Sequence, residues 1–160
     1  MASLMLGLMP LSACDKSQAQ AEGTQAPAAS HIASGWANSA DEFRQRWNAL
    51  TKPVYALSPF QAKKASFSDG AVTYMSNGMI TVDTDDHQAV GAICVIAYMA
   101  AYGSDHDEAH VIVDAAIQDG HASEESGSGF MGSKTYNGHM MGVTMTASGK
   151  VTCTFLNHAG

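Results

Sequence analysis

The spacing of apolar residues predicts a helix that begins directly after Ser39. Ser39 and Glu42 form a capping-box pair, in which a serine at the N-cap is followed three residues later by an acid. The apolar residues after Ser39 then recur at the three- and four-residue spacing of one helical face: Ala40, Phe43, Trp47 and Leu50. Pro53 ends this helix, because the residue before a proline avoids the helical conformation. We expect Arg44 and Arg46 to stay in water.

Two hairpins are indicated by strand-like segments that flank tight-turn residues. Residues 71–75 and 79–82 are rich in strand-forming residues, and the glycine-containing turn at 76–78 lies between them. Near the end of the chain, residues 139–147 and 151–155 are separated by a turn at Ser148-Gly149. Each hairpin provides one antiparallel pair of strands.

Between the two hairpins the apolar period becomes that of a helix. We expect Thr84 to cap this helix, with Asp85 and Asp86 in the first turn, where carboxylates suit the helix dipole. The sequence that follows is apolar nearly all round, which is typical of a buried helix. Gly103 provides its C-terminal end.

A second helix follows at once. Ser104 or Asp105 caps it, and we expect it to continue to about Asp119, where Gly120 stops it. Residues 121–132 are rich in Gly, Ser and Glu and are expected to form a loop. The loop contains a Gly-x-Gly-x-x-Gly pattern, but strand-like sequence follows it where a dinucleotide site requires a helix.

The expected order is therefore helix, two strands, two helices, two strands. This order predicts an α+β fold of two layers, in which an antiparallel sheet made of two hairpins packs on the helices. We expect a single globular domain over residues 39–160. The residues before it are rich in Ala, Gln, Ser and Gly and have no apolar period, which indicates a flexible tether.

Leu11-Ser12-Ala13-Cys14 follows an apolar opening and resembles the lipobox of bacterial lipoproteins. In that family the chain is cleaved before the cysteine, which then carries a thioether-linked lipid. The resemblance implies a signal peptide over residues 1–13 and a lipidated Cys14 with its tether over residues 14–38. No Lys or Arg precedes Cys14, although a secretory signal starts with basic residues, so we expect the true N-terminus to lie upstream.

The same resemblance implies an address in the cell envelope. Each buried methylene of an acyl chain contributes about 0.8 kcal/mol, and two or more chains make anchoring stable. The domain would face the periplasm or the cell exterior. Asp15 is similar to the residue that retains enterobacterial lipoproteins in the inner membrane, so that membrane is slightly favoured. The alternative for residues 1–13 is an ordinary buried apolar segment.

The chain carries a net charge of −7, and no Lys or Arg occurs between Lys64 and Lys134. This charge argues against nucleic acid, whose binding depends on neutralising phosphates, and against a polybasic membrane patch. The acids of the stretch form either a solvated face or a docking surface for a basic protein partner or divalent cations. The candidate surface comprises Asp83, Asp85, Asp86, Asp105, Asp107, Glu108, Glu124 and Glu125.

The cysteines agree with an oxidising compartment. Once Cys14 is assigned to lipid, Cys94 and Cys153 remain as an even pair. A bond between them would close a loop of about 59 residues and contribute about 4 kcal/mol in the loop-entropy description. The alternative is two buried free thiols, which behave as small hydrophobic side chains.

His106 and His110 are the best candidate metal ligands, because residues four apart on a helix project to one side. The segment is similar to the His-Glu-x-x-His motif of zinc proteases, but Asp107 stands where that motif has its glutamate. No third ligand is identifiable, although His87 or His121 are candidates. The alternative is two surface histidines.

The sequence offers one further surface and no catalytic motif. Met140, Met141 and Met145 lie close to Tyr136 and His139, and they form either an adaptable binding surface or part of the core. No nucleophile elbow occurs around Ser128.

We therefore expect no catalytic residues and no cofactor, with a divalent metal as the alternative. The first hypothesis for function is a non-enzymatic binding module of the envelope that engages a protein partner through its acidic surface. The second is a metal-dependent protein or enzyme that uses His106 and His110. The third is a purely structural envelope lipoprotein.

Overall fold

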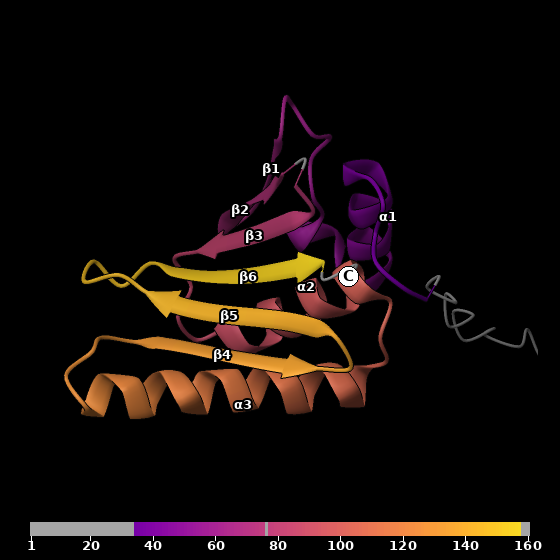
Figure 1. Ribbon diagram of the computed structural model, residues 1–160. Coiled ribbons are helices and arrows are strands. Elements are labelled where there is room, and N and C mark those ends of the chain that lie inside the picture. Colours follow the sequence, from indigo (N-terminus) through magenta and orange to yellow (C-terminus); the bar gives the residue numbers. More distant parts are fainter. Residues whose placement is uncertain (1–33, 76, 158–160) are drawn as a thin grey trace, which may run out of the picture.

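The computed structural model describes residues 34–75 and 77–157, so the lipobox, Cys14 and most of the expected tether lie outside the described residues. The described chain is an α+β fold of two layers, in which helices cover one face of an antiparallel sheet (Figure 1). Its elements are α1 (Ala40–Leu50), the 3₁₀ turn η1 (Pro53–Tyr55), β1 (Lys64–Phe67), β2 (Gly70–Tyr74), β3 (Met79–Thr84), α2 (Val90–Tyr102), α3 (His106–Glu125), β4 (Met131–Tyr136), β5 (His139–Met145) and β6 (Val151–Asn157).

The sheet has six strands in the order β1-β2-β3-β6-β5-β4. Each half of the chain contributes three consecutive antiparallel strands, and the two halves join where β3 pairs with β6. The register at this junction runs from Met79 opposite Leu156 to Thr84 opposite Val151. The two expected hairpins are present as β2–β3 and β5–β6, and the sheet has one more strand at each edge than expected.

The two edge strands, β1 and β4, were not predicted from the sequence, for different reasons. β1 is short and buries only Ala65 and Phe67, which is too brief an alternation to identify a strand. β4 has a single buried residue, Gly132, so it has no hydrophobic alternation at all. Asn137-Gly138 joins β4 to β5 with positive φ at both residues, and Asn-Gly is a dipeptide typical of two-residue hairpin turns.

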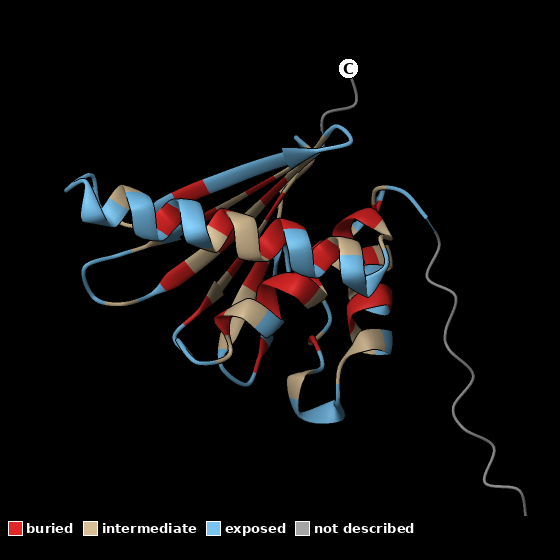
Figure 2. Cartoon of the chain, turned by 90° about the horizontal axis from the view of Figure 1, so that it is seen from below, coloured by how far each residue is buried: buried red, intermediate tan, exposed pale blue. Residues whose placement is uncertain are grey.

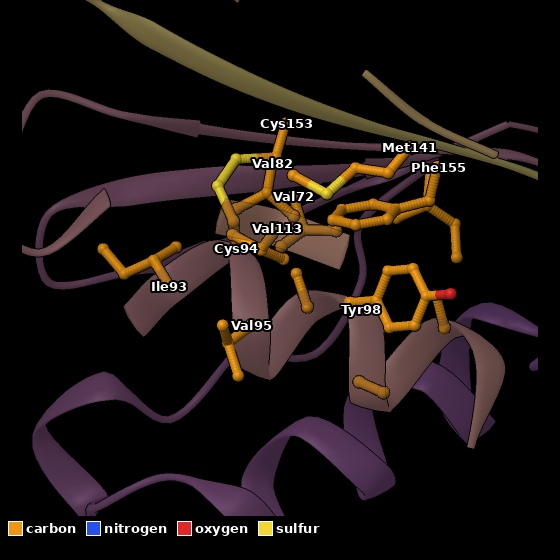
Figure 3. Close-up of a cluster of buried hydrophobic side chains, with 14 of the residues drawn as sticks. Val72, Val82, Ile93, Cys94, Val95, Tyr98, Val113, Met141, Cys153 and Phe155 are labelled. Carbon is orange, nitrogen blue, oxygen red and sulfur yellow. A yellow bond between two sulfur atoms is a disulfide. The ribbon is translucent and has the colours of Figure 1, made fainter. Parts of the chain in front are cut away.

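The core lies between the sheet and α2 (Figure 3). Alternate residues of β3, β5 and β6 point to the helices, and Val82, Val143 and Cys153 lie opposite one another across these strands with no exposed surface. Cys153 is bonded to Cys94 of α2, which confirms the expected disulfide. The bond links the central helix to a central strand across 59 residues of sequence.

The start of α1 agrees with the capping prediction and extends it. Ser39 Oγ accepts the Glu42 N–H at 3.1 Å, and Glu42 in turn accepts the N–H of Asn38 at 2.9 Å. The expectation for Arg46 was wrong, because its side chain is only 6% exposed. Its guanidinium donates to the Gly35 carbonyl at 2.6 Å and pairs with Glu42, which ties the segment before α1 to the helix.

That segment packs on the end of α2. The N–H groups of Gly35 and Ala37 donate to the carbonyls of Tyr102 and Ala101, and Ala37 is fully buried. The ring of Trp36 lies 5.2 Å from that of Tyr102. Residues 35–37, which the sequence assigned to the tether, therefore contribute to the core.

The start of α2 differs from the prediction. Thr84 is the buried last residue of β3, and the helix begins at Val90. The hydroxyl of Thr84 accepts the N–H of Asp86, and the carboxylate of Asp86 accepts the N–H groups of Gln88 and Ala89. The polar residues thus organise a turn before the helix. The C-terminal end agrees with the prediction, since Gly103 has a φ of 64°.

The end of α3 also differs. Asp105 caps its start as expected, but the helix continues through Gly120 to Glu125. Gly120 packs closely against Phe130, because an added Cβ would lie 2.7 Å from that ring. Figure 2 shows α3 along the sheet, with its buried residues facing inward and its exposed residues facing outward. The glycine-rich loop is therefore short, and it leads from a helix into a strand, the reverse of a dinucleotide motif.

Candidate functional site

A hollow of about 430 Å³ lies beside the first two turns of α3. Helical spacing brings several of its lining residues to one side of α3, and the end of β4 adds an aromatic ring. We call this site the acidic hollow; its lining residues are Asp105, Asp107, Glu108, Val111, Ile112 and Tyr136. Three carboxylates and an apolar wall thus share one opening.

The apolar part of the acidic hollow is unusually open to solvent. Val111 is 66% exposed and Tyr136 is 47% exposed, and they are two of the four large hydrophobic residues that are exposed among the described residues. Asp105 is held in place because its carboxylate accepts the Glu108 N–H at 2.8 Å as the helix cap. Asp107 points fully into solvent. An exposed apolar wall thus lies beside the exposed carboxylate of Asp107, which is 3.6 Å from His106 Nδ1.

A second group of polar residues lies behind Glu108, and we call it the histidine cluster: Tyr98, Tyr102, Glu108 and His139. The His139 ring is stacked on Tyr102, with ring centroids 4.2 Å apart. Glu108 Oε1 accepts the Tyr98 hydroxyl at 3.4 Å and lies 3.9 Å from His139 Nδ1. Glu108 is therefore shared between the acidic hollow and the histidine cluster.

The tyrosines of this cluster are held neutral by burial. Burial raises the pKa of Tyr98 well above its usual range, and the nearby Glu108 carboxylate adds to the effect. Burial likewise raises the pKa of Tyr102, although the Leu156 N–H, which donates to its hydroxyl oxygen at 3.1 Å, partly opposes the shift. The Tyr102 hydroxyl lies 2.7 Å from the Met140 carbonyl and 2.8 Å from the Leu156 carbonyl, so it fixes β5 and β6 against α2.

His106 and His110 open onto a different hollow, of about 520 Å³, between the outer face of α2 and the start of α3. Their rings lie 5.8 Å apart, and His110 Nδ1 is 2.8 Å from the Asp114 carboxylate. The rest of this apolar groove is lined by Leu50, Gly91, Ala92, Val95, Ile96 and Met99. The two histidines thus line the same hollow.

The proposed metal site lacks further ligands in the part of the chain that the structure describes. No group of three or more His, Cys, Asp or Glu residues is placed to hold a metal ion there. His87 lies against Gly149 in the turn between β5 and β6, and His121 packs on Phe130. Neither of these two histidines lines the hollow of His106 and His110.

The other acids of the expected surface are placed apart from the acidic hollow. Asp83 pairs with Lys150 at 3.2 Å and accepts the Thr152 hydroxyl at 2.6 Å. Glu124 and Glu125 end α3, about 25 Å along the helix from Glu108 at 1.5 Å per residue. The acidic stretch of sequence therefore does not form one continuous surface, and only Asp105, Asp107 and Glu108 of the predicted residues line the hollow.

The methionine surface is divided by strand alternation. Met141 is fully buried in the core, whereas Met140 and Met145 are partly exposed. In the sequence Tyr136 and His139 are only neighbours of these methionines. Their approach to α3 could not be foreseen, because it depends on the pairing of β4 with β5 and on the position of α3.

Comparison of the chain with known protein families, with curated proteins and with solved structures finds no match. The helices of the described residues are also too short or too polar to span a membrane.

Proposed function

We propose that the protein is a non-enzymatic binding module that engages a basic segment of a protein partner at the acidic hollow. We also propose the location that the lipobox implies, in which a lipid on Cys14 anchors the chain to a membrane of the cell envelope. The domain would face the periplasm or the cell exterior, with the inner membrane slightly favoured by Asp15.

One observation carries the proposal: carboxylates and an exposed aromatic ring meet in one hollow. A Lys or Arg side chain has an apolar stem and a charged end, so it needs both kinds of surface. The exposed Val111 provides contact for the stem, and Asp107 and Glu108 provide charge for the end. The exposed ring of Tyr136 adds a face on which a guanidinium stacks.

The charge of the chain favours the same kind of partner. The residues that line the acidic hollow include three acids and no base. The net charge of −7 extends an attractive field to a basic partner beyond the contact itself. Such a field mainly increases the rate of association and makes it sensitive to salt.

Binding of a short oligoarginine peptide to the full chain, measured by calorimetry at low and high salt, tests this function. We expect binding at low salt that weakens as salt is added, because exposed charges are screened. D107N and Y136S should each weaken binding about three- to tenfold, given the modest energies of exposed ion pairs and cation–π contacts. Asp105 is not suitable for this test, because its carboxylate caps α3.

A matched control comes from the far end of the same helix. E124Q and E125Q remove the same charges from exposed positions of α3 that do not line the acidic hollow. We expect these variants to bind nearly as well as the wild type. Salt-independent binding, or an equal loss in the control variants, would refute the acidic hollow as the site. No binding under any condition would favour the purely structural hypothesis.

The location in the cell envelope is tested separately from the binding. Mass spectrometry of the N-terminal peptide from cells should detect acyl groups on Cys14, and C14S should release the protein from the membrane fraction. A protein that stays unmodified and soluble in cells would refute the lipid anchor and leave the binding proposal standing.

A further inference from the structure

The contact between Glu108 and His139 is incomplete in the structure. His139 Nδ1 is buried and has no hydrogen-bond partner. The nearest carboxylate oxygen, Oε1 of Glu108, is 3.9 Å away and accepts a long bond of 3.4 Å from the Tyr98 hydroxyl. Both distances exceed those of a good hydrogen bond, so neither contact holds the Glu108 carboxylate tightly in place.

We propose that protonation of His139 draws Glu108 out of the acidic hollow, so that the protein releases its basic partner at acidic pH. The inference rests on the proposed function for the identity of the partner. The movement of Glu108 is a property of the free protein.

The driving force is the hydrogen bond that a protonated imidazole requires. A neutral imidazole leaves one ring nitrogen as an acceptor, whereas the imidazolium donates from both nitrogens. A buried N–H without an acceptor is costly, and a charge-assisted bond to a carboxylate is strong. A shift of about 1 Å in the Glu108 carboxylate would bring it within bonding distance of His139 Nδ1. The Tyr102 ring, stacked on His139, also stabilises a cation.

The other groups that face His139 do not supply this charge. Tyr98 and Tyr102 approach from α2, and burial keeps both neutral by raising the pKa of each. Tyr136 on β4 and Asn157 on β6 are its neighbours in the sheet. Among these described neighbours, Glu108 is the one that carries a charge near neutral pH.

The consequence for the acidic hollow is the loss of one of its three carboxylates. When Glu108 pairs with the imidazolium, its charge is neutralised and its oxygen is turned away from a bound guanidinium. Asp105 and Asp107 keep their places, because neither contacts His139 in the structure. Binding should therefore weaken in acid without being abolished.

Binding of the oligoarginine peptide from about pH 7.5 to about pH 5.5, a range that includes the usual titration of histidine, tests the effect on the partner. We expect the wild type to lose about fivefold more affinity over this range than H139Q, which corresponds to an exposed charge pair of about 1 kcal/mol. At the higher pH, H139Q should bind like the wild type, since His139 does not line the acidic hollow.

The design separates His139 from the other histidines. His106 lies 3.6 Å from Asp107 and will also weaken binding when protonated, but every variant retains it. H121Q is the matched control, because His121 is exposed on α3, the helix that carries Glu108, and does not line the acidic hollow. H121Q should keep the full pH dependence of the wild type. Equal pH dependence in the wild type and H139Q would refute the switch.

A measurement on the free protein keeps the inference testable even if no basic peptide binds. Long-range ¹H–¹⁵N spectra report which imidazole nitrogens carry protons. At about pH 5.5 the proton on His139 Nδ1 should be present and protected from exchange in the wild type, and E108Q should remove the protection. An unprotected or absent proton in the wild type would refute the switch, whereas a protected proton without peptide binding would refute only the proposed partner.

Discussion

Gly132 on β4 lies so close to Ala116 on α3 that an added Cβ would stand 1.9 Å from the Ala116 carbonyl oxygen. The same Cβ would lie 2.5 Å from the backbone nitrogen of Gly120. The long helix therefore rests directly on the backbone of the edge strand. This contact fixes how α3 lies along the sheet, and with it the position of the acidic hollow between α3 and Tyr136.

The first prediction is that G132A destabilises the protein by about 3 kcal/mol or more, because the helix and strand must separate to admit one methyl group. Urea unfolding measures the loss. G91A is the matched control, since a Cβ at Gly91 meets nothing within 4 Å and alanine is favoured in a helix. Its stability should rise by about 0.5 kcal/mol. A G132A variant of wild-type stability would show that α3 and β4 separate easily.

The second prediction concerns the bond between Cys94 and Cys153, which closes a separation of 59 residues. Replacing both cysteines with alanine should lower the free energy of unfolding by about 4 kcal/mol, because the unfolded chain gains the freedom of an open loop. The same measurement on the wild type in a reducing agent should show a similar loss. If reduction leaves the unfolding midpoint unchanged, the bond does not form in solution.

The third prediction is a loss of stability at alkaline pH that depends on Tyr98. Its folded pKa is raised by burial and by Glu108, so the unfolded chain releases this proton first as pH rises. Stability is therefore complete below the unfolded value of about 10 and falls as pH rises above it. Unfolding measured over this range should show a shallower fall for Y98F. Equal slopes would mean that Tyr98 ionises as readily in the folded protein.

The fourth prediction tests the role of Arg46. R46M should destabilise the protein by about 2–3 kcal/mol, because the Gly35 carbonyl and Glu42 each lose a charged hydrogen-bond partner. R44M is the control, since Arg44 is half-buried, its Nε has no hydrogen-bond partner, and its ion pair with the exposed Asp41 is a long 3.6 Å contact. It should change stability by less than about 0.5 kcal/mol. Similar losses in the two variants would contradict a special role for Arg46.

Local patterns predicted the elements whose residues are strongly periodic or capped. Ser39 and Asp105 cap helices because their side chains reach N–H groups only three residues ahead. The hairpins β2–β3 and β5–β6 follow from alternation and turn residues within a short stretch. The disulfide between Cys94 and Cys153 was predicted because these are the two cysteines that remain once Cys14 is assigned to the lipid.

The failures occurred where distant contacts override local preference. Gly120 has a low helix propensity, but α3 continues through it to Glu125, and its bare backbone packs against Phe130. Arg46 has a charged side chain, which favours an exposed position. It is buried because the carbonyls of Gly35 and Ala100 accept hydrogen bonds from it in the interior. β4 has no alternation of apolar and polar residues. Its one buried residue, Gly132, packs against the backbone of α3, so the strand has no row of apolar side chains facing the core.

For the candidate site, the sequence by itself determined that acids cluster at the start of α3, since these residues are neighbours in the chain. Only the tertiary structure decided which of the acids act together. The length of α3 separates Glu124 and Glu125 from the others, and Lys150 pairs with Asp83. Strand pairing and helix packing then bring Tyr136 and His139 to Glu108. Charge and local propensity are properties of neighbouring residues, whereas a binding site is made by residues that meet only after the chain has folded.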